Sequence, residues 1–359
     1  MLKVRLDKVR EAMRKARVDA VLVTHMPNVF YLSGFTGSTA ALLVTAEDSY
    51  ILVDPRYSVQ ARAECKLAEV RDYSGISLVK AAACLINELR PARVWFEPEY
   101  LTVSSYRELR RSIREPVRLR SVRDAIERLR RTKDQHEILL IRKACEIADA
   151  AFEAVLPQIK PGLTEKAVAC LIDSTLRTLG ADKEAFETIA ASGPNSACPH
   201  ASPTDAVLRD GDLLKLDFGA RRQGYNSDIT RTICLGKPSA KQAEVFEIVL
   251  EAQLRAIEAI APGKSGCEID SVARDYIVSK GYGENFGHGL GHQIGIEVHD
   301  GPGFSQTSDL VLQPGNVLTV EPGIYIPGWG GVRIEDDVLV TDTGAQILTR
   351  SPKQLSYPI

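Results

Sequence analysis

The sequence lacks paired cysteines, a long apolar run and an excess of either charge, and each absence argues against a class of protein. Its seven cysteines are widely spaced and include no C-x-x-C pair, so neither a disulfide framework nor a zinc ribbon is indicated. No segment approaches the roughly eighteen apolar residues that suggest a membrane span. The first helical stretch carries too many charges for a secretory signal. We therefore expect a cytoplasmic protein that does not contact a membrane.

The charge balance gives no indication of a nucleic-acid partner. The 359 residues include 45 basic and 47 acidic side chains, which leaves a formal net charge of -2. The composition, 44% hydrophobic and 26% charged, is ordinary for a globular enzyme or binding protein. At this length the chain can form two domains and bury a sizeable core.

The order of strand-like and helical patterns predicts two domains of α/β (α+β) class. Short β-like runs alternate with helical patterns in the first part of the chain, and we place the boundary near residue 125, which gives domains 1–125 and 126–359. The second domain repeats one plan. Two helical patterns lead to paired strands at 212–235, and two more lead to paired strands at 316–341.

The first of these hairpins carries two carboxylates. In LLKLDFGARRQGYNSDITRTI, strict alternation puts Leu214, Leu216 and Phe218 on one face and Asp217 on the other, and Asp228 lies on the returning strand. The two carboxylates can face each other across the hairpin. They can equally occupy the solvent face of an amphipathic sheet, and this hairpin alone does not decide between the two.

The second hairpin favours a metal site. Glu321 and Glu335 interrupt apolar runs, where a charge is unfavourable unless it is paired or binds a metal. By itself, Glu335 would fit a structural ion pair with Arg333 on the same strand face. Four carboxylates gathered from two equivalent hairpins would repel each other without cations, and an oxygen-rich site suits hard or borderline divalent ions. The sequence therefore predicts a two-metal centre.

Histidine is scarce, yet three of the six histidines lie in the segment HGLGHQIGIEVHDGPG, residues 288–303. His288 and His292 have the four-residue spacing of a helical zinc motif, but no Glu follows His288 and glycines surround both, so H-E-x-x-H is not matched. Each of these histidines could instead be a structural residue whose hydrogen bonds are satisfied.

These segments resemble the pita-bread metallopeptidases, in their Xaa-Pro aminopeptidase and prolidase branch. The resemblance rests on LDFG, YNSDITRT, GHGLGHQIGIEVHDGP, LTVEPGIYI and GGVRIEDDVLV, and it covers the chain from about residue 130 to its end. NVFYLSGFTGSTAALLVT and DPRYSVQA resemble the creatinase-type amino-terminal domain of the same proteins. The implied fold is a small creatinase-type α/β domain followed by a pseudo-twofold pita-bread catalytic domain.

The resemblance also implies the site residues. The metal ligands fall on Asp217, Asp228, His292, Glu321 and Glu335. The active-site histidines fall on His200, His288 and His299. His299 or His288 would stabilise the oxyanion or protonate the leaving nitrogen, and the glycines would let the backbone approach the metals and the peptide.

The implied mechanism uses two divalent ions, with Mn, Co, Zn and Fe all compatible with these ligands. Ions bridged by Asp228 and Glu335 would hold a hydroxide that attacks the carbonyl preceding proline. Glu321 would also accept the proton of the attacking water, and Arg333 would support the ligand shell from outside.

The preferred substrate depends on one departure from the family pattern. Prolidases of this branch commonly place an arginine after the V-H-E segment, and the matching residue here is Gly303. We therefore expect an Xaa-Pro aminopeptidase, acting as a homodimer on short proline-containing peptides, with Xaa-Pro dipeptidase (prolidase) as the alternative if Arg56 supplies the cation. A metal-free creatinase-like hydrolase and a non-catalytic binding module are disfavoured because all the ligand positions are filled.

Overall fold

The computed structural model describes residues 1–357, and the chain divides into two compact units. The first unit is Met1–Arg130 and the second begins at Arg131, so the division falls within helix α6 (Glu127–Arg131), just after the predicted boundary near residue 125. Within residues 1–357, no helix has both the length and the apolar character needed to cross a bilayer.

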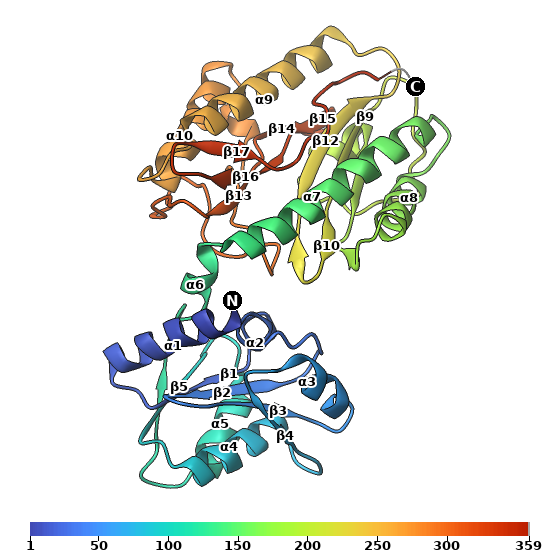
Figure 1. The fold of residues 1–359 in the computed structure, drawn as a ribbon. Coiled ribbons are helices and arrows are strands. Elements are labelled where there is room, and N and C mark those ends of the chain that lie inside the picture. Colours follow the sequence, from blue (N-terminus) through green and yellow to red (C-terminus); the bar gives the residue numbers. More distant parts are fainter. Residues whose placement is uncertain (358–359) are drawn as a thin grey trace. The chain divides into compact units, whose positions relative to one another are not determined.

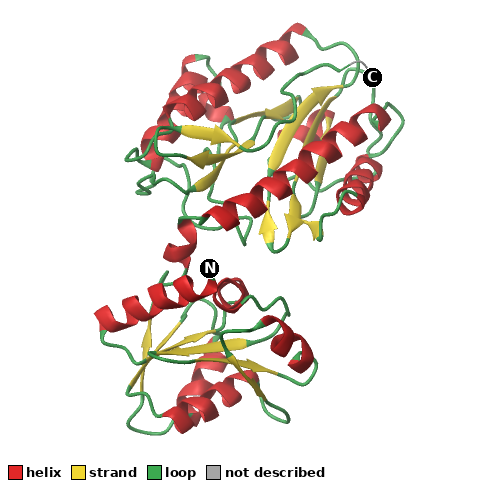
Figure 2. Ribbon diagram, viewed as in Figure 1, coloured by secondary structure: helices red, strands yellow, loops and turns green. Residues whose placement is uncertain are grey.

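The first unit is a six-stranded mixed sheet with helices on both faces (Figures 1 and 2). Its strand order is β4-β3-β2-β1-β5-β6, where β1 pairs antiparallel with β2 and parallel with β5. The strands are β1 (Ala20–Val23), β2 (Ala41–Thr45), β3 (Ser49–Val53), β4 (Glu69–Asp72), β5 (Arg93–Phe96) and β6 (Arg118–Ser121). The helices are α1 (Leu2–Ala16), α2 (Met26–Ser33), α3 (Ser58–Glu64), α4 (Leu78–Leu89) and α5 (Val103–Ser112). The predicted α/β class is confirmed.

The second unit contains the predicted helix–helix–hairpin plan twice. The first half comprises α7 (Gln135–Val155), α8 (Glu165–Thr178), β9 (Leu213–Phe218) and β12 (Ile229–Cys234). The second half comprises α9 (Ala240–Ala259), α10 (Gly266–Ser279), β13 (Val317–Val320) and β16 (Asp336–Val340). The remaining elements are η1 (Leu156–Gln158), β7 (Lys183–Glu184), β8 (Ile189–Ser192), η2 (Gly193–Ala197), β10 (Ala220–Arg222), β11 (Tyr225–Asn226), η3 (Gly283–Asn285), β14 (Gly323–Ile326), β15 (Gly330–Arg333) and β17 (Ala345–Ile347).

Side-chain caps start the four helices at equivalent points. Three of them carry a capping box, in which the cap and the third helical residue bond to each other's backbone: Asp134 with Glu137, Ser239 with Gln242, and Ser265 with Glu268. The fourth, α8, is capped by Thr164 alone. Thr164 and Ser265 each form an isolated antiparallel bridge, to Val207 and Val311, which marks the same junction in both halves.

The hairpins bring the polar strand ends together. Leu214, Leu216 and Phe218 pack into the core beneath α7 and α8, so Asp217 faces the other way, as the alternation predicts. In the three-stranded sheet β12-β9-β8, Asp217 pairs with both Ile189 and Thr230. The two halves meet where the Glu335 N–H donates to the Thr230 carbonyl at 3.1 Å.

Candidate metal centre

Every site residue named from the sequence lines one cavity of about 630 Å³ in the second unit: His200, Asp217, Asp228, His288, His292, His299, Glu321, Arg333 and Glu335. The sequence did not single out the rest of the lining, which comprises Phe186, Glu187, Ile189, Pro199, Ala201, Ser202, Gly289, Gly291 and Val298.

The carboxylates occupy equivalent places on the two hairpins. Asp217 lies at the end of β9, and Glu321 directly follows β13. Asp228 directly precedes β12, and Glu335 directly precedes β16. The two hairpins therefore bring four carboxylates to the wall of the same cavity.

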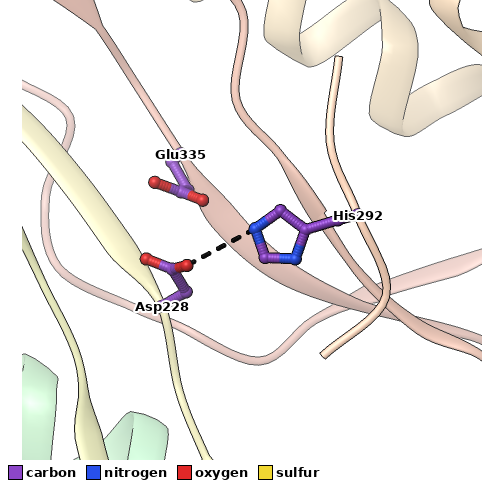
Figure 3. A group of neighbouring side chains, drawn as sticks. All are labelled: Asp228, His292 and Glu335. Atoms are coloured by element: carbon purple, nitrogen blue, oxygen red, sulfur yellow. Dashed lines mark ion pairs between the residues drawn. The ribbon is translucent and has the colours of Figure 1, made fainter. Parts of the chain in front are cut away.

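Asp228, His292 and Glu335 form the tightest group, with one ligand atom of each lying within 4.8 Å of the others (Figure 3). His292 Nε2 is 3.6 Å from Asp228 Oδ2 and 3.6 Å from Glu321 Oε1. Its Nδ1 lies 3.1 Å from the Gln293 carbonyl, which can only accept, so Nδ1 carries the proton and the Nε2 lone pair faces the carboxylates.

The electrostatics of the group call for a cation. Burial, reinforced by neighbouring carboxylates, raises the pKa of Asp228 and of Glu335 well above the usual range, and burial raises the pKa of Glu321 to about 7. Burial lowers the pKa of His292, so its 3.6 Å approach to Asp228 does not supply a compensating charge. Within the described residues, Oδ1 of Asp217 and Oδ1 of Asp228 are buried without a hydrogen bond. This oxygen-rich donor set with one neutral imidazole fits divalent ions.

Arg333 supports the centre through Asp217, with which its guanidinium forms an ion pair. Its other donors reach three further groups: Thr230 Oγ1 at 3.0 Å, the Pro199 carbonyl at 3.1 Å and Tyr325 Oη at 2.8 Å. The sequence suggested a shared face with Glu335, but that carboxylate accepts instead from Thr230 Oγ1 at 2.5 Å. Arg333 and Glu335 therefore meet at the same Thr230 hydroxyl, which accepts from the guanidinium and donates to the carboxylate.

The three cavity histidines other than His292 differ in how their rings are engaged. His288 Nδ1 lies 2.8 Å from the Gly289 carbonyl and Nε2 lies 3.0 Å from Tyr325 Oη, and burial lowers the pKa of His288 to about 4. The ring of His299 lies 4.0 Å from that of His292. Within residues 1–357, the ring nitrogens of His200 and His299 form no hydrogen bond, so these two rings are available to a substrate.

Two sets of hydrogen bonds from charged side chains, which the sequence did not single out, hold the segments that carry His200 and His288. Glu165, the first residue of α8, accepts the N–H and O–H of Ser192 at 2.6 and 2.8 Å and those of Thr204 at 3.0 and 2.6 Å. It therefore holds both ends of segment 192–204, which contains His200. In the sequence Glu165 reads as an ordinary first-turn acid beside its cap.

The second set of hydrogen bonds comes from two charged side chains of α10. Arg274 forms a two-pronged ion pair with Asp270 at 2.7 and 2.9 Å and donates to the carbonyls of Phe286 at 3.0 Å and His288 at 2.7 Å. Asp270 accepts the Leu290 N–H at 3.1 Å. The i,i+4 spacing of the pair was visible in the sequence, but such pairs usually lie on a solvated helix face.

Gly303 has a structural explanation that changes its interpretation. A Cβ at this position would lie 2.0 Å from the Gly291 carbonyl oxygen and 2.3 Å from His292 Cα. Gly303 is therefore needed for close packing of two backbones, and it does not line the cavity. Its lack of a side chain is therefore explained by packing, and the expectation about substrate length that was drawn from it stays a prediction.

Comparison with known proteins follows the same division of the chain. The family model described as Metallopeptidase family M24 matches residues 140–342, and the Creatinase/Prolidase N-terminal domain matches residues 5–132. A solved structure of Xaa-Pro dipeptidase from Bacillus anthracis is 42% identical, with 99% of each chain covered and a TM-score of 0.95. One of X-Pro aminopeptidase from Thermotoga maritima is 38% identical, with 98% of each covered and a TM-score of 0.92. An Xaa-Pro dipeptidase from Pyrococcus horikoshii is 40% identical over 98% of both chains.

Proposed function

Because the chain belongs to metallopeptidase family M24, with a creatinase/prolidase N-terminal domain and a pita-bread fold, we propose that it is an Xaa-Pro aminopeptidase. The observation that carries the proposal is the convergence of Asp228, His292 and Glu335 at the wall of one cavity. The relatives named above as dipeptidases and an aminopeptidase act, by their names, on Xaa-Pro bonds.

We assign the ligands of two divalent ions, Mn, Co, Zn or Fe, to residues of both halves: Asp217, Asp228, His292, Glu321 and Glu335. Such ions, when bound, polarise a carbonyl oxygen and lower the pKa of water. The chain's part is to hold the ligands in place. Thr319 Oγ1 supports the centre twice, because it donates to Glu321 Oε1 at 3.2 Å and accepts the His292 N–H at 3.0 Å.

The roles of the remaining site residues depend on which side chains have no hydrogen-bond partner. Glu321 takes the proton of the attacking water. His299, whose ring nitrogens have no partner among the described residues, donates to the leaving proline nitrogen, and His200 contacts the substrate from the exposed side. His288 orients neighbours through the chain Arg333, Tyr325, His288, because both its ring nitrogens are already engaged.

The lining favours a peptide that continues beyond proline. The carboxylate of a dipeptide needs a cationic partner. Arg333 is the sole Arg or Lys in the cavity lining of the described second unit, and Asp217, Thr230, Pro199 and Tyr325 occupy four of its five N–H donors. Xaa-Pro dipeptidase activity is the alternative, and the names of the relatives from Bacillus anthracis and Pyrococcus horikoshii favour it.

The test compares an Xaa-Pro-Xaa tripeptide with the matching Xaa-Pro dipeptide at saturating metal, together with metal analysis of the purified protein. We expect at least equal kcat/KM for the tripeptide. Cleavage of the dipeptide alone would establish the alternative, and cleavage of neither with any of the four metals would overturn both. A cytoplasmic location and a homodimer stay predictions.

A further inference from the structure

We infer that Glu187 makes the enzyme select a basic first residue in its substrate, an inference that rests on the proposed function. Glu187 lines the cavity and is exposed. Within residues 1–357, its carboxylate forms no hydrogen bond or ion pair. A carboxylate that faces a substrate cavity without a partner is available to a ligand cation.

The backbone around Glu187 directs its side chain into the cavity. Thr188 donates from Oγ1 to Asp173 Oδ1 at 2.5 Å, toward α8, whereas Glu187 and Ile189 on either side both line the cavity. This alternation is that of an extended chain. The neighbouring acid Glu184 does not line the cavity and is already paired with Arg177 at 2.6 Å.

The strand register sets the distance between Glu187 and the ligands. Ile189 lies directly opposite Asp217 in the β8–β9 pairing. Glu187 lies two residues before Ile189, which places it about 7 Å further along the strand direction. The substrate's α-ammonium is fixed close to the carbonyl that is attacked, so it cannot lie that far from the ligands. The ammonium or guanidinium at the end of a lysine or arginine side chain can.

The assigned roles place the first residue on the Glu187 side. In the proposed roles His299 donates to the proline nitrogen, so proline lies beside His299. We assign the first residue to the other side of the scissile bond, where Glu187 would meet its side chain. Two divalent ions, when bound, would balance the four carboxylates that we assign as ligands. Glu187 therefore contributes the uncompensated negative charge that the first side chain meets.

The experiment measures kcat/KM for Lys-Pro-Ala, norleucyl-Pro-Ala and Ala-Pro-Lys at saturating metal. Norleucine matches lysine in length and lacks its charge. We expect Lys-Pro-Ala to exceed norleucyl-Pro-Ala by about three- to tenfold, somewhat above an exposed ion pair because the cavity wall is partly desolvated, and the ratio to fall at high salt. Glu187→Gln should bring the ratio to about one, and Glu187→Lys should invert it. The matched control Glu184→Gln should keep it.

Three outcomes would overturn the inference. The wild-type enzyme could cleave Lys-Pro-Ala and norleucyl-Pro-Ala with equal kcat/KM, or Glu184→Gln could abolish the preference for Lys-Pro-Ala. The third such outcome is that lysine raises kcat/KM only in the third position of the peptide. Cleavage of the norleucyl peptide in those cases leaves the proposed function standing. If no Xaa-Pro-Ala peptide is cleaved, the proposed function fails and this inference fails with it.

Discussion

The two halves of the second unit place their carboxylates at equivalent strand ends but support the neighbouring segments by different means. In the first half, the acceptor and the donor are separate. Glu165 accepts N–H and O–H groups at the ends of segment 192–204, and buried Lys215 donates to its carbonyls at Ser196, Cys198 and Pro199. Neither Glu165 nor Lys215 forms an ion pair within residues 1–357.

In the second half, the acceptor and the donor are one ion pair. Asp270 and Arg274 lie one turn apart on α10 and together bind Phe286, His288 and Leu290 through their backbones. This segment leads into His292, which we assign as a metal ligand, whereas segment 192–204 carries the exposed His200. The two halves therefore match in their backbone plan and in the positions of the proposed metal ligands. They differ in the polar side chains that hold the neighbouring segments. The half that carries His292, the proposed imidazole ligand, has the charge-paired support.

The largest loss of turnover should come from removing Asp228, which occupies the same place in the first hairpin as Glu335 does in the second. Asp228→Ala removes one of the two matching carboxylates, so turnover should fall far beyond the about hundredfold cost of losing an outer partner of a metal site, and bound metal should be lost. The fold should persist because the change removes a buried charge. Metal analysis and turnover at saturating metal check this, with exposed Asp182→Ala as the control. Full turnover in Asp228→Ala would contradict the ligand assignment.

A second comparison tests the two supports directly. Arg274→Met leaves Asp270 buried without its partner and should destabilise the protein by about 3–5 kcal/mol. Glu165→Gln keeps the shape but weakens charge-assisted bonds, and we expect about 1–3 kcal/mol. Urea unfolding gives both values. Adding Asp270→Asn to Arg274→Met should recover part of the loss, since the uncompensated charge is removed. An equal cost for the two single variants would mean that the ion pair has no special role.

The convergence of the acidic residues on one cavity could be predicted because it follows from local pattern. Strand alternation and turn spacing put Asp217 and Asp228 on a hairpin, and an acid inside an apolar run, as at Glu321 or Glu335, is anomalous in any fold. The family membership and pita-bread fold that the resemblance implied are confirmed. The assigned roles of the site residues stay predictions.

What could not be predicted depends on contacts distant in sequence. Glu165 reads as a first-turn helix charge until Ser192 and Thr204 are seen to close on it. The ion pair of Arg333 with Asp217 could not be predicted because the two residues lie 116 positions apart in the sequence. The packing requirement at Gly303 could not be predicted because the Gly291 carbonyl that it faces lies twelve residues earlier in the same segment.

A smaller effect is expected when His299, whose ring nitrogens form no hydrogen bond within the described residues, is compared with His288, whose ring nitrogens both contact a partner. His299→Ala should lower turnover by about a hundredfold, the range of a lost general acid or oxyanion donor, and should leave bound metal in place. His288→Ala should cost less turnover, because both ring nitrogens are taken by Gly289 and Tyr325. Measuring turnover and bound metal for both variants distinguishes these roles. Loss of metal in His299→Ala would make His299 a ligand and contradict its assigned role.

The smallest effect concerns the pH dependence of the metal-free protein. Burial raises the folded-state pKa of Glu321 from 4.5 to about 7. A raised pKa means that the folded state binds the proton more tightly, so this contribution to stability is present below pH 4.5 and lost as the pH rises through about 7. The histidines titrate in the opposite sense, so the difference between Glu321→Gln and wild type isolates the carboxylate. In EDTA, the variant should gain about 1–3 kcal/mol relative to wild type between pH 5 and pH 8. Glu268→Gln is the control. The Ser265 N–H lowers the pKa of Glu268 to about 2, so its difference curve should be flat over this range. A flat curve for Glu321→Gln as well would mean that Glu321 ionises normally without metal.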